Sequence, residues 1–140
     1  MDQSQKEAFK SLSKAAGAFE TLSEKETTLE KDSLCDLRKG VTKALKEICL
    51  AEGQCITIER AESGNQTPSL ISSLCHDTSM KFQNAIDLLT SPNPVPNPSP
   101  NPKLLEYLNF KKKVHIYICL FVCLFFLFHF FFQYFLNKYF

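Results

Sequence analysis

Apolar residues recur every three or four positions through the first 90 residues of the chain, with charged and polar residues between them. This spacing is typical of amphipathic helices, because side chains three or four positions apart lie on one face of a helix. The pattern predicts helices at about residues 4–29, 34–62 and 69–89, with a shift in phase at residues 27–33 between the first two. The predicted fold class is therefore mainly α.

These helices are interpreted as a helical interaction region spanning residues 1–90, either a short hairpin or a three-helix unit. Because the unit is small and its apolar faces are narrow, we expect another chain to complete its core. The expected partner is a helical protein or a second copy of this chain, and a short coiled coil is one form of such an assembly. The apolar face expected to bind the partner consists of Phe9, Leu12, Phe19, Leu34, Leu37, Val41, Ile48, Leu74, Phe82, Ile86 and Leu89.

Two local features complicate the second predicted helix. Gly40 and Gly53 each weaken this helix by roughly 1 kcal/mol relative to alanine, and of the two Gly53 is the expected place for a break. The segment that follows it, Cys55-Ile56-Thr57-Ile58, is rich in β-branched residues, so a short extended piece is the competing prediction there.

Residues 91–102 form a proline-rich linker in which every second residue is proline. Such a sequence is not compatible with a helix interior or a central strand, and it favours an extended polyproline conformation. At about 3.1 Å per residue we expect a spacer of roughly 35 Å between the helical region and the segment that follows. Binding of these prolines by an SH3 or WW domain is the alternative role.

A basic juxtamembrane segment, residues 103–113, precedes an apolar run at residues 114–136 that only His115, His129 and Gln133 interrupt. At 1.5 Å per residue this run is roughly 34 Å long, enough to cross a hydrocarbon core of about 30 Å. It predicts a single transmembrane helix, so membrane lipid is an expected partner. Residues 137–140 form a short tail beyond it.

The lysines before the apolar run predict its orientation. Lys111, Lys112 and Lys113 lie next to the predicted span, and basic residues beside a span usually stay in the cytosol. The first residues of the chain are polar and resemble no secretory signal. We therefore expect a tail-anchored protein of an endomembrane with its N-terminus in the cytosol. Cys119 lies near the expected cytosolic interface and is a candidate for palmitoylation.

The composition of the C-terminal segment points to a second interpretation. Residues 107–140 contain no Ala, Gly, Ser, Thr, Pro, Asp, Glu or Arg, whereas natural spans usually include small residues where helices pack. So restricted an alphabet is what translation of T- and A-rich nucleic acid gives, as when alternative splicing runs into non-coding sequence. In this view the protein is a soluble cytoplasmic or nuclear subunit of a helical assembly, and its hydrophobic tail is incidental.

Charge and motifs argue against several classes of function. The net charge is +1, with 16 basic and 15 acidic residues, so no nucleic-acid partner is predicted. No catalytic constellation, cofactor motif or glycine-rich phosphate loop is present in the sequence, and we expect no enzyme. Four of the six cysteines, Cys35, Cys49, Cys55 and Cys75, are interpreted as buried free thiols. Cys49, Cys55, Cys75 and His76 lack a C-x-x-C pair, so no metal site is predicted.

The leading functional hypothesis is a tail-anchored helical adaptor, which binds partner proteins through its amphipathic helices at a membrane surface. The soluble subunit with an incidental tail is the alternative.

Overall fold

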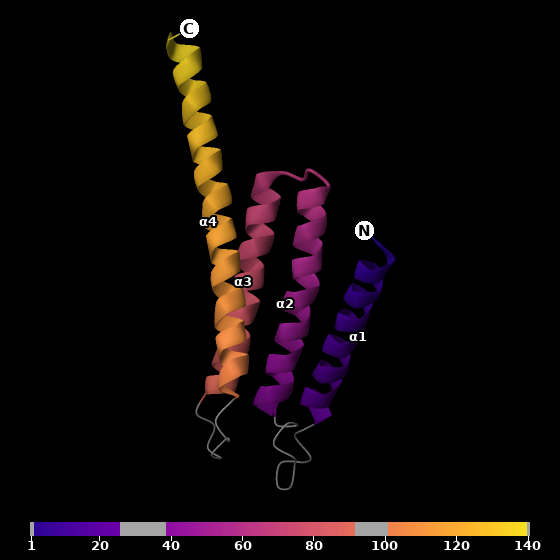
Figure 1. Cartoon of the computed structure of the whole chain (residues 1–140). Coiled ribbons are helices and arrows are strands. Elements are labelled where there is room, and N and C mark those ends of the chain that lie inside the picture. Colours follow the sequence, from indigo (N-terminus) through magenta and orange to yellow (C-terminus); the bar gives the residue numbers. More distant parts are fainter. Residues whose placement is uncertain (1, 26–38, 92–100, 140) are drawn as a thin grey trace.

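The computed structural model describes residues 2–25, 39–91 and 101–139, and every regular element among them is a helix. The helices are α1 (Gln3–Lys25), α2 (Lys39–Ser63), α3 (Pro68–Thr90) and α4 (Pro102–Tyr139). Figure 1 shows α1 to α4 side by side in chain order, each antiparallel to the one before it, with α4 extending far beyond the others. The prediction of a mainly α fold is confirmed.

The hydrophobic core lies between α2, α3 and α4. Phe82 of α3 and Leu108 of α4 are its largest fully buried apolar side chains, and small alanines of α2 and α3 allow the helix backbones to approach closely. Partly buried side chains from the three helices extend this core along their length. The buried members are Ala44, Ala51, Phe82, Ala85, Ile86, Leu89 and Leu108, and the partly buried ones are Val41, Ile48, Cys55, Leu88, Leu104 and Leu105.

The first part of α4 completes this core from within the chain. Leu104, Leu105 and Leu108 pack against it, although the sequence analysis treated residues 103–113 only as a basic segment beside the membrane. The amphipathic pattern of this segment was not recognised in the sequence, because its three leucines form a short pattern with lysines on either side. A second chain is therefore not needed to cover the apolar side of α2 and α3, contrary to the expectation from the sequence.

The α1 helix packs along α2 at the other edge of the bundle. Gly53 does not break α2, which is helical through this position and through residues 55–58, so both local predictions for this segment were wrong. The buried Gly53 faces α1, where a Cβ atom would lie 3.7 Å from the Phe9 ring and 4.0 Å from the Leu12 Cβ. Packing against a neighbouring helix offsets the low helix propensity of glycine here.

The turn between α2 and α3 is short and locally determined. Asn65 has a positive φ of 51°, and the Gln66 amide donates a hydrogen bond of 3.0 Å to the Ala61 carbonyl, a pairing that ends α2. Thr67 is the N-cap residue of α3, and Pro68 occupies its first turn. The turn lies at the end of the bundle from which α4 extends (Figure 1).

Residues 26–38 and 92–100 lie outside the described residues, and they include Leu34, Leu37, Cys35 and most of the proline-rich linker. On either side of the linker, however, α3 and α4 pack along one another. The sequence predicted that α4 lies roughly 35 Å from the helical region, whereas α4 packs directly on α3. Burial of apolar side chains between α3 and α4 favours this packing.

Candidate anchoring and interaction surfaces

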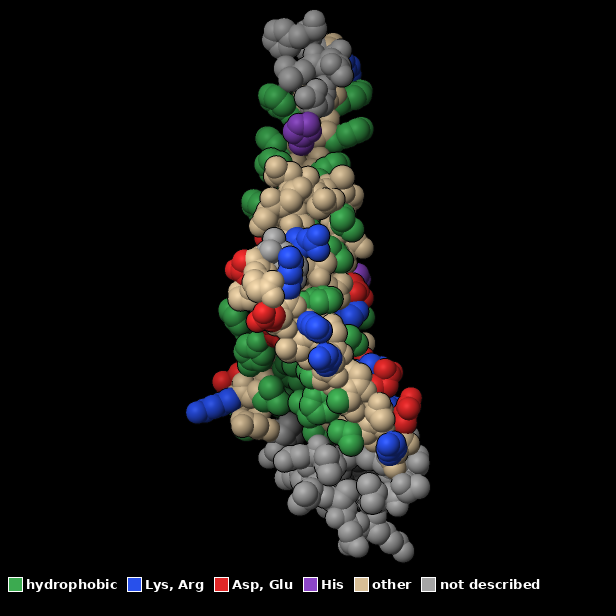
Figure 2. Space-filling model, turned by 90° about the vertical axis from the view of Figure 1, so that its right-hand side faces the viewer, with side chains coloured by type: hydrophobic (Ala, Val, Ile, Leu, Met, Phe, Trp, Pro, Cys, Tyr) green, Lys and Arg blue, Asp and Glu red, His purple; other side chains and the backbone are tan. Residues whose placement is uncertain are grey.

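The second half of α4 is a largely apolar helix that extends past its contact with α3 at Cys123 and beyond the end of the bundle (Figure 1). Among the described residues α4 is the one helix long and apolar enough to cross a membrane; its candidate segment is Pro102–Phe132, and only 6% of the most apolar stretch of this segment is buried. Figure 2 shows charged side chains gathered over the wide lower part of the molecule, and hydrophobic side chains on both sides of the narrow upper part. The large side chains more than half exposed here are Leu120, Phe121, Leu124, Phe125, Phe126, Leu127, Phe128, Phe130, Phe131, Phe132, Tyr134 and Phe135.

Two of the three lysines predicted to set membrane topology contact the bundle. The Lys111 ammonium lies 3.1 Å from the Glu52 carboxylate, which also accepts a hydrogen bond of 2.6 Å from the Tyr107 hydroxyl. Lys112 donates to the Gln83 side-chain oxygen at 2.8 Å. These contacts tie α4 to α2 and α3 on both sides, a role that the sequence pattern did not predict.

The candidate lipidation residue, Cys119, lies at the contact between α3 and α4. Its sulfur is 3.1 Å from the Ser72 hydroxyl oxygen, and the sulfur of Cys123, one helical turn further, is 3.2 Å from the same oxygen. Cys119 is half-buried and Cys123 is exposed. Palmitoylation of Cys119 stays a prediction.

A buried polar pair joins α2 and α4. The Cys55 sulfur lies 3.2 Å from His115 Nε2, and the His115 ring stacks on Phe82 with 6.0 Å between ring centroids. His115 Nδ1 is buried and has no hydrogen-bond partner. Burial raises the pKa of the Cys55 thiol to about 11, so this thiol stays protonated at neutral pH and is a poor nucleophile.

Cys75, on α3, is also sequestered. It is completely buried, and this burial raises the pKa of its thiol to about 11. Cys49, Cys55 and Cys75 are free, as predicted, although only Cys75 is fully buried; Cys119 and Cys123 are free as well. Within residues 2–25, 39–91 and 101–139, no three metal-ligating side chains are grouped so that they could hold a metal ion.

The residues expected to bind a partner are for the most part used between the chain's own helices. Phe82, Ile86 and Leu89 are buried in the core, and Val41 and Ile48 pack against it. The others on described helices are less covered: Leu12, Phe19 and Leu74 are half-buried, and Phe9 is 41% exposed.

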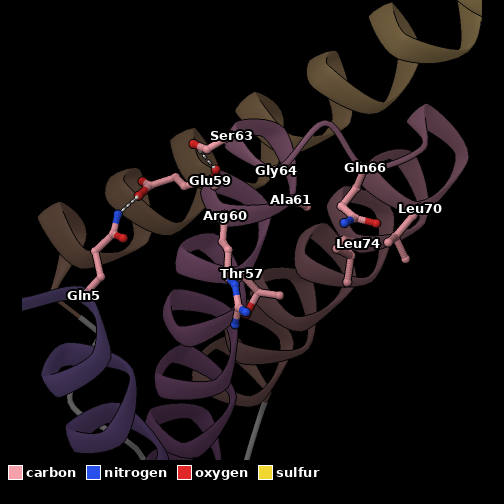
Figure 3. Close-up of a pocket in the computed structure, with 10 residues that line it drawn as sticks. All are labelled: Gln5, Thr57, Glu59, Arg60, Ala61, Ser63, Gly64, Gln66, Leu70 and Leu74. Carbon is pink, nitrogen blue, oxygen red and sulfur yellow. Dashed lines mark hydrogen bonds between the residues drawn. The ribbon is translucent and has the colours of Figure 1, made fainter. Parts of the chain in front are cut away.

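A shallow pocket lies at the upper end of the bundle, where α1 begins and α2 turns into α3 (Figure 3). Its volume is about 630 Å³. Arg60 and Thr57 of α2 line it together with Leu70 and Leu74 of α3, and Gln5 of α1 donates a hydrogen bond of 3.3 Å to Glu59 at its edge. No motif in the sequence marked this pocket, because its residues come from three helices and share no regular spacing.

Comparison with known proteins identifies the helical part of the chain. A protein from Xenopus tropicalis, "BRO1 domain-containing protein BROX", is 36% identical over 95 residues, which make up 64% of this chain. The chain spans about a quarter of that relative, because the matched region is 23% of its length. No solved structure matches the chain. The model of the family described as "BRO1-like domain" matches residues 1–121, well over half of the sequence, so the chain belongs to the BRO1-like domain family.

Proposed function

We propose that this chain is a helical adaptor anchored through α4, whose bundle binds protein partners at a membrane surface. BRO1-like domains are helical protein-interaction domains, and that part of the function follows from membership of the family. Anchoring is the further step of the proposal. One observation supports it: α4 continues beyond the bundle as a helix that is apolar on every side, and most of its large side chains there are exposed. Water is a poor environment for such a helix and hydrocarbon is a good one.

The proposed orientation places the bundle in the cytosol, with the chain held in an endomembrane in a tail-anchored arrangement. Lys111, Lys112 and Lys113 lie on the N-terminal side of the apolar run, and Lys138 follows it. The excess of positive charge is therefore on the bundle side, which favours the cytosol. The proposed activity is recruitment of proteins by binding, and it requires no catalysis.

The decisive test changes only the apolar face of the protruding helix. Leu124→Arg with Leu127→Arg in the full chain places two charges in the proposed span, each costing roughly 2.5–3.5 kcal/mol at the centre of a bilayer. We expect the unmodified chain to resist carbonate extraction from cell membranes and the double variant to be released. The matched control is Ser73→Arg with Asn84→Arg, which adds the same two charges at exposed positions of α3. Release of the unmodified chain by carbonate would exclude the anchor.

The second candidate function is a soluble subunit whose apolar tail is incidental. One observation favours it: the family model ends at residue 121, close to the point where α4 leaves the bundle. Carbonate extraction of the unmodified chain separates the two candidates, and affinity capture then locates the binding surface. If the charged variant loses its membrane association but keeps the same protein partners, binding resides in the bundle, and the anchor determines only where binding occurs.

A further inference from the structure

Part of the predicted span in α4 lies against α3 in the bundle. Gln83 of α3 contacts Lys112, and Ser72 of α3 contacts Cys123. The two contacts are 11 residues apart on each helix, so α3 and α4 keep one antiparallel register over this distance. Helix α3 begins at Pro68, four residues before Ser72. If the register continues over these four residues, Pro68 lies level with Leu127.

Too little of α4 extends beyond this level to cross a membrane. The residues from Phe128 to Tyr139 number 12, and at 1.5 Å per residue they extend roughly 18 Å. A hydrocarbon core is about 30 Å thick. With the bundle packed as it is, the helix tip can therefore enter a bilayer but cannot span it.

The lysines lead to the same conclusion. Lys113 is 14 residues before Leu127, which places it roughly 21 Å below the upper end of the bundle. In the packed arrangement Lys111 and Lys112 contact Glu52 and Gln83. These lysines would lie at the headgroups only if residues 114–136 were in the hydrocarbon region. Residues 114–136 would then no longer contact α3.

No residue in α4 provides a bend that would satisfy both arrangements. After Pro102 the chain contains neither proline nor glycine, the usual causes of a sharp kink. We infer that α4 alternates between two partners over residues 115–127, lying against α3 in the closed bundle and leaving α3 when it spans a bilayer. This inference rests on the proposed anchoring. Insertion then uncovers side chains that α4 covers in the closed bundle, including Cys75 and Phe82.

A reversible covalent lock tests the inference. Ser72→Cys would place a second sulfur about 3 Å from the Cys119 sulfur, since the present oxygen lies at 3.1 Å, and a small movement allows a disulfide of about 2.0 Å. Cys123→Ser removes the competing thiol. The matched control carries Ser72→Cys with both Cys119→Ser and Cys123→Ser, so that no such bond can form. Each full-length chain is oxidised in mild detergent and then transferred to phosphatidylcholine vesicles that contain brominated lipid.

The readout is a single tryptophan, because the chain has none of its own. Phe131→Trp reports entry of the tip, and Ile116→Trp reports insertion of the part that lies beside the bundle. We expect bromolipid to quench Phe131→Trp in every chain. It should quench Ile116→Trp in the control and in the reduced lock, but not in the oxidised lock.

The two proposals fail in different ways. If Phe131→Trp is not quenched in any chain, α4 does not enter the membrane and the anchoring proposal fails. If the tip is quenched but Ile116→Trp is quenched equally in the oxidised and reduced lock, α4 spans without leaving α3, and the competition is disproved. Quenching of the tip without any quenching of Ile116→Trp in the reduced lock disproves it as well.

Discussion

The two halves of α4 differ in how well their burial follows from their hydrophobicity. The first half contains four of the five lysines of the helix, yet Leu108 and His115 are buried in it. The second half is far more apolar, yet side chains such as Phe128 remain 72% exposed. Burial in the bundle requires one apolar face that matches a neighbouring helix, whereas an all-round apolar surface has no matching neighbour in a small domain. Amphipathic pattern therefore predicts packing, and total hydropathy predicts only which solvent the helix prefers.

The largest expected effect compares one residue type in the two halves. Leu108→Ala removes a fully buried side chain from the core, and we expect it to lower the free energy of unfolding by about 2–5 kcal/mol. Leu127→Ala, in the exposed half, should change it by less than about 0.5 kcal/mol. Urea unfolding of the full chain in mild detergent measures both. Equal losses from the two variants would show that the halves of α4 do not differ in the way described.

This difference also explains what could be predicted from the sequence. The three helices before the linker were predicted because their apolar residues recur along 20 or more positions, and the apolar run was predicted because it is continuous. The packing of residues 104–108 was missed because three leucines among lysines give too short a pattern. The expected break of α2 at Gly53 was wrong. Local helix propensity does not include the contact of this position with Phe9, which is a tertiary effect.

The candidate site was less predictable than the fold. The lysines and Cys119 were identified from their position beside an apolar run, but their contacts with Glu52, Gln83 and Ser72 depend on the register between helices far apart in sequence. His115 was interpreted as an interruption of the apolar run, whereas it lies buried against Cys55. The upper pocket depends in the same way on three helices meeting.

The second prediction uses alkaline pH to test whether the bundle excludes water from Cys75. Burial raises the pKa of this thiol from 9.0 to about 11, while the unfolded chain keeps the ordinary value. The buried thiol therefore contributes its full stability below pH 9, and this contribution is lost as the pH rises from 9 to 11. We expect unfolding measurements to show a loss of up to about 3 kcal/mol from this thiol over that interval.

Cys75→Ala is the matched control for this titration, because it keeps a small apolar side chain and removes the ionisable group. Part of the alkaline loss should remain in that variant, because burial also raises the pKa of Cys55 to about 11. A loss as large as that of the unmodified chain would show that Cys75 does not contribute. Water would then reach this part of the interface between α3 and α4.

The smallest effect is expected at Gly53, at the edge of the bundle away from α4. Gly53→Ala adds a methyl group at an ordinary contact distance of 3.7 Å from the Phe9 ring, so the gain in helix propensity is not offset by a clash. We expect the free energy of unfolding to rise by about 0.5–1 kcal/mol. Gly17→Ala, where a methyl group would meet nothing within 4 Å, should give a similar gain. If only Gly17→Ala stabilises the chain, α1 packs more tightly on α2 than described. If both variants stabilise it while bromolipid quenching of Phe131→Trp stays unchanged, bundle stability and tip insertion depend on separate parts of the chain.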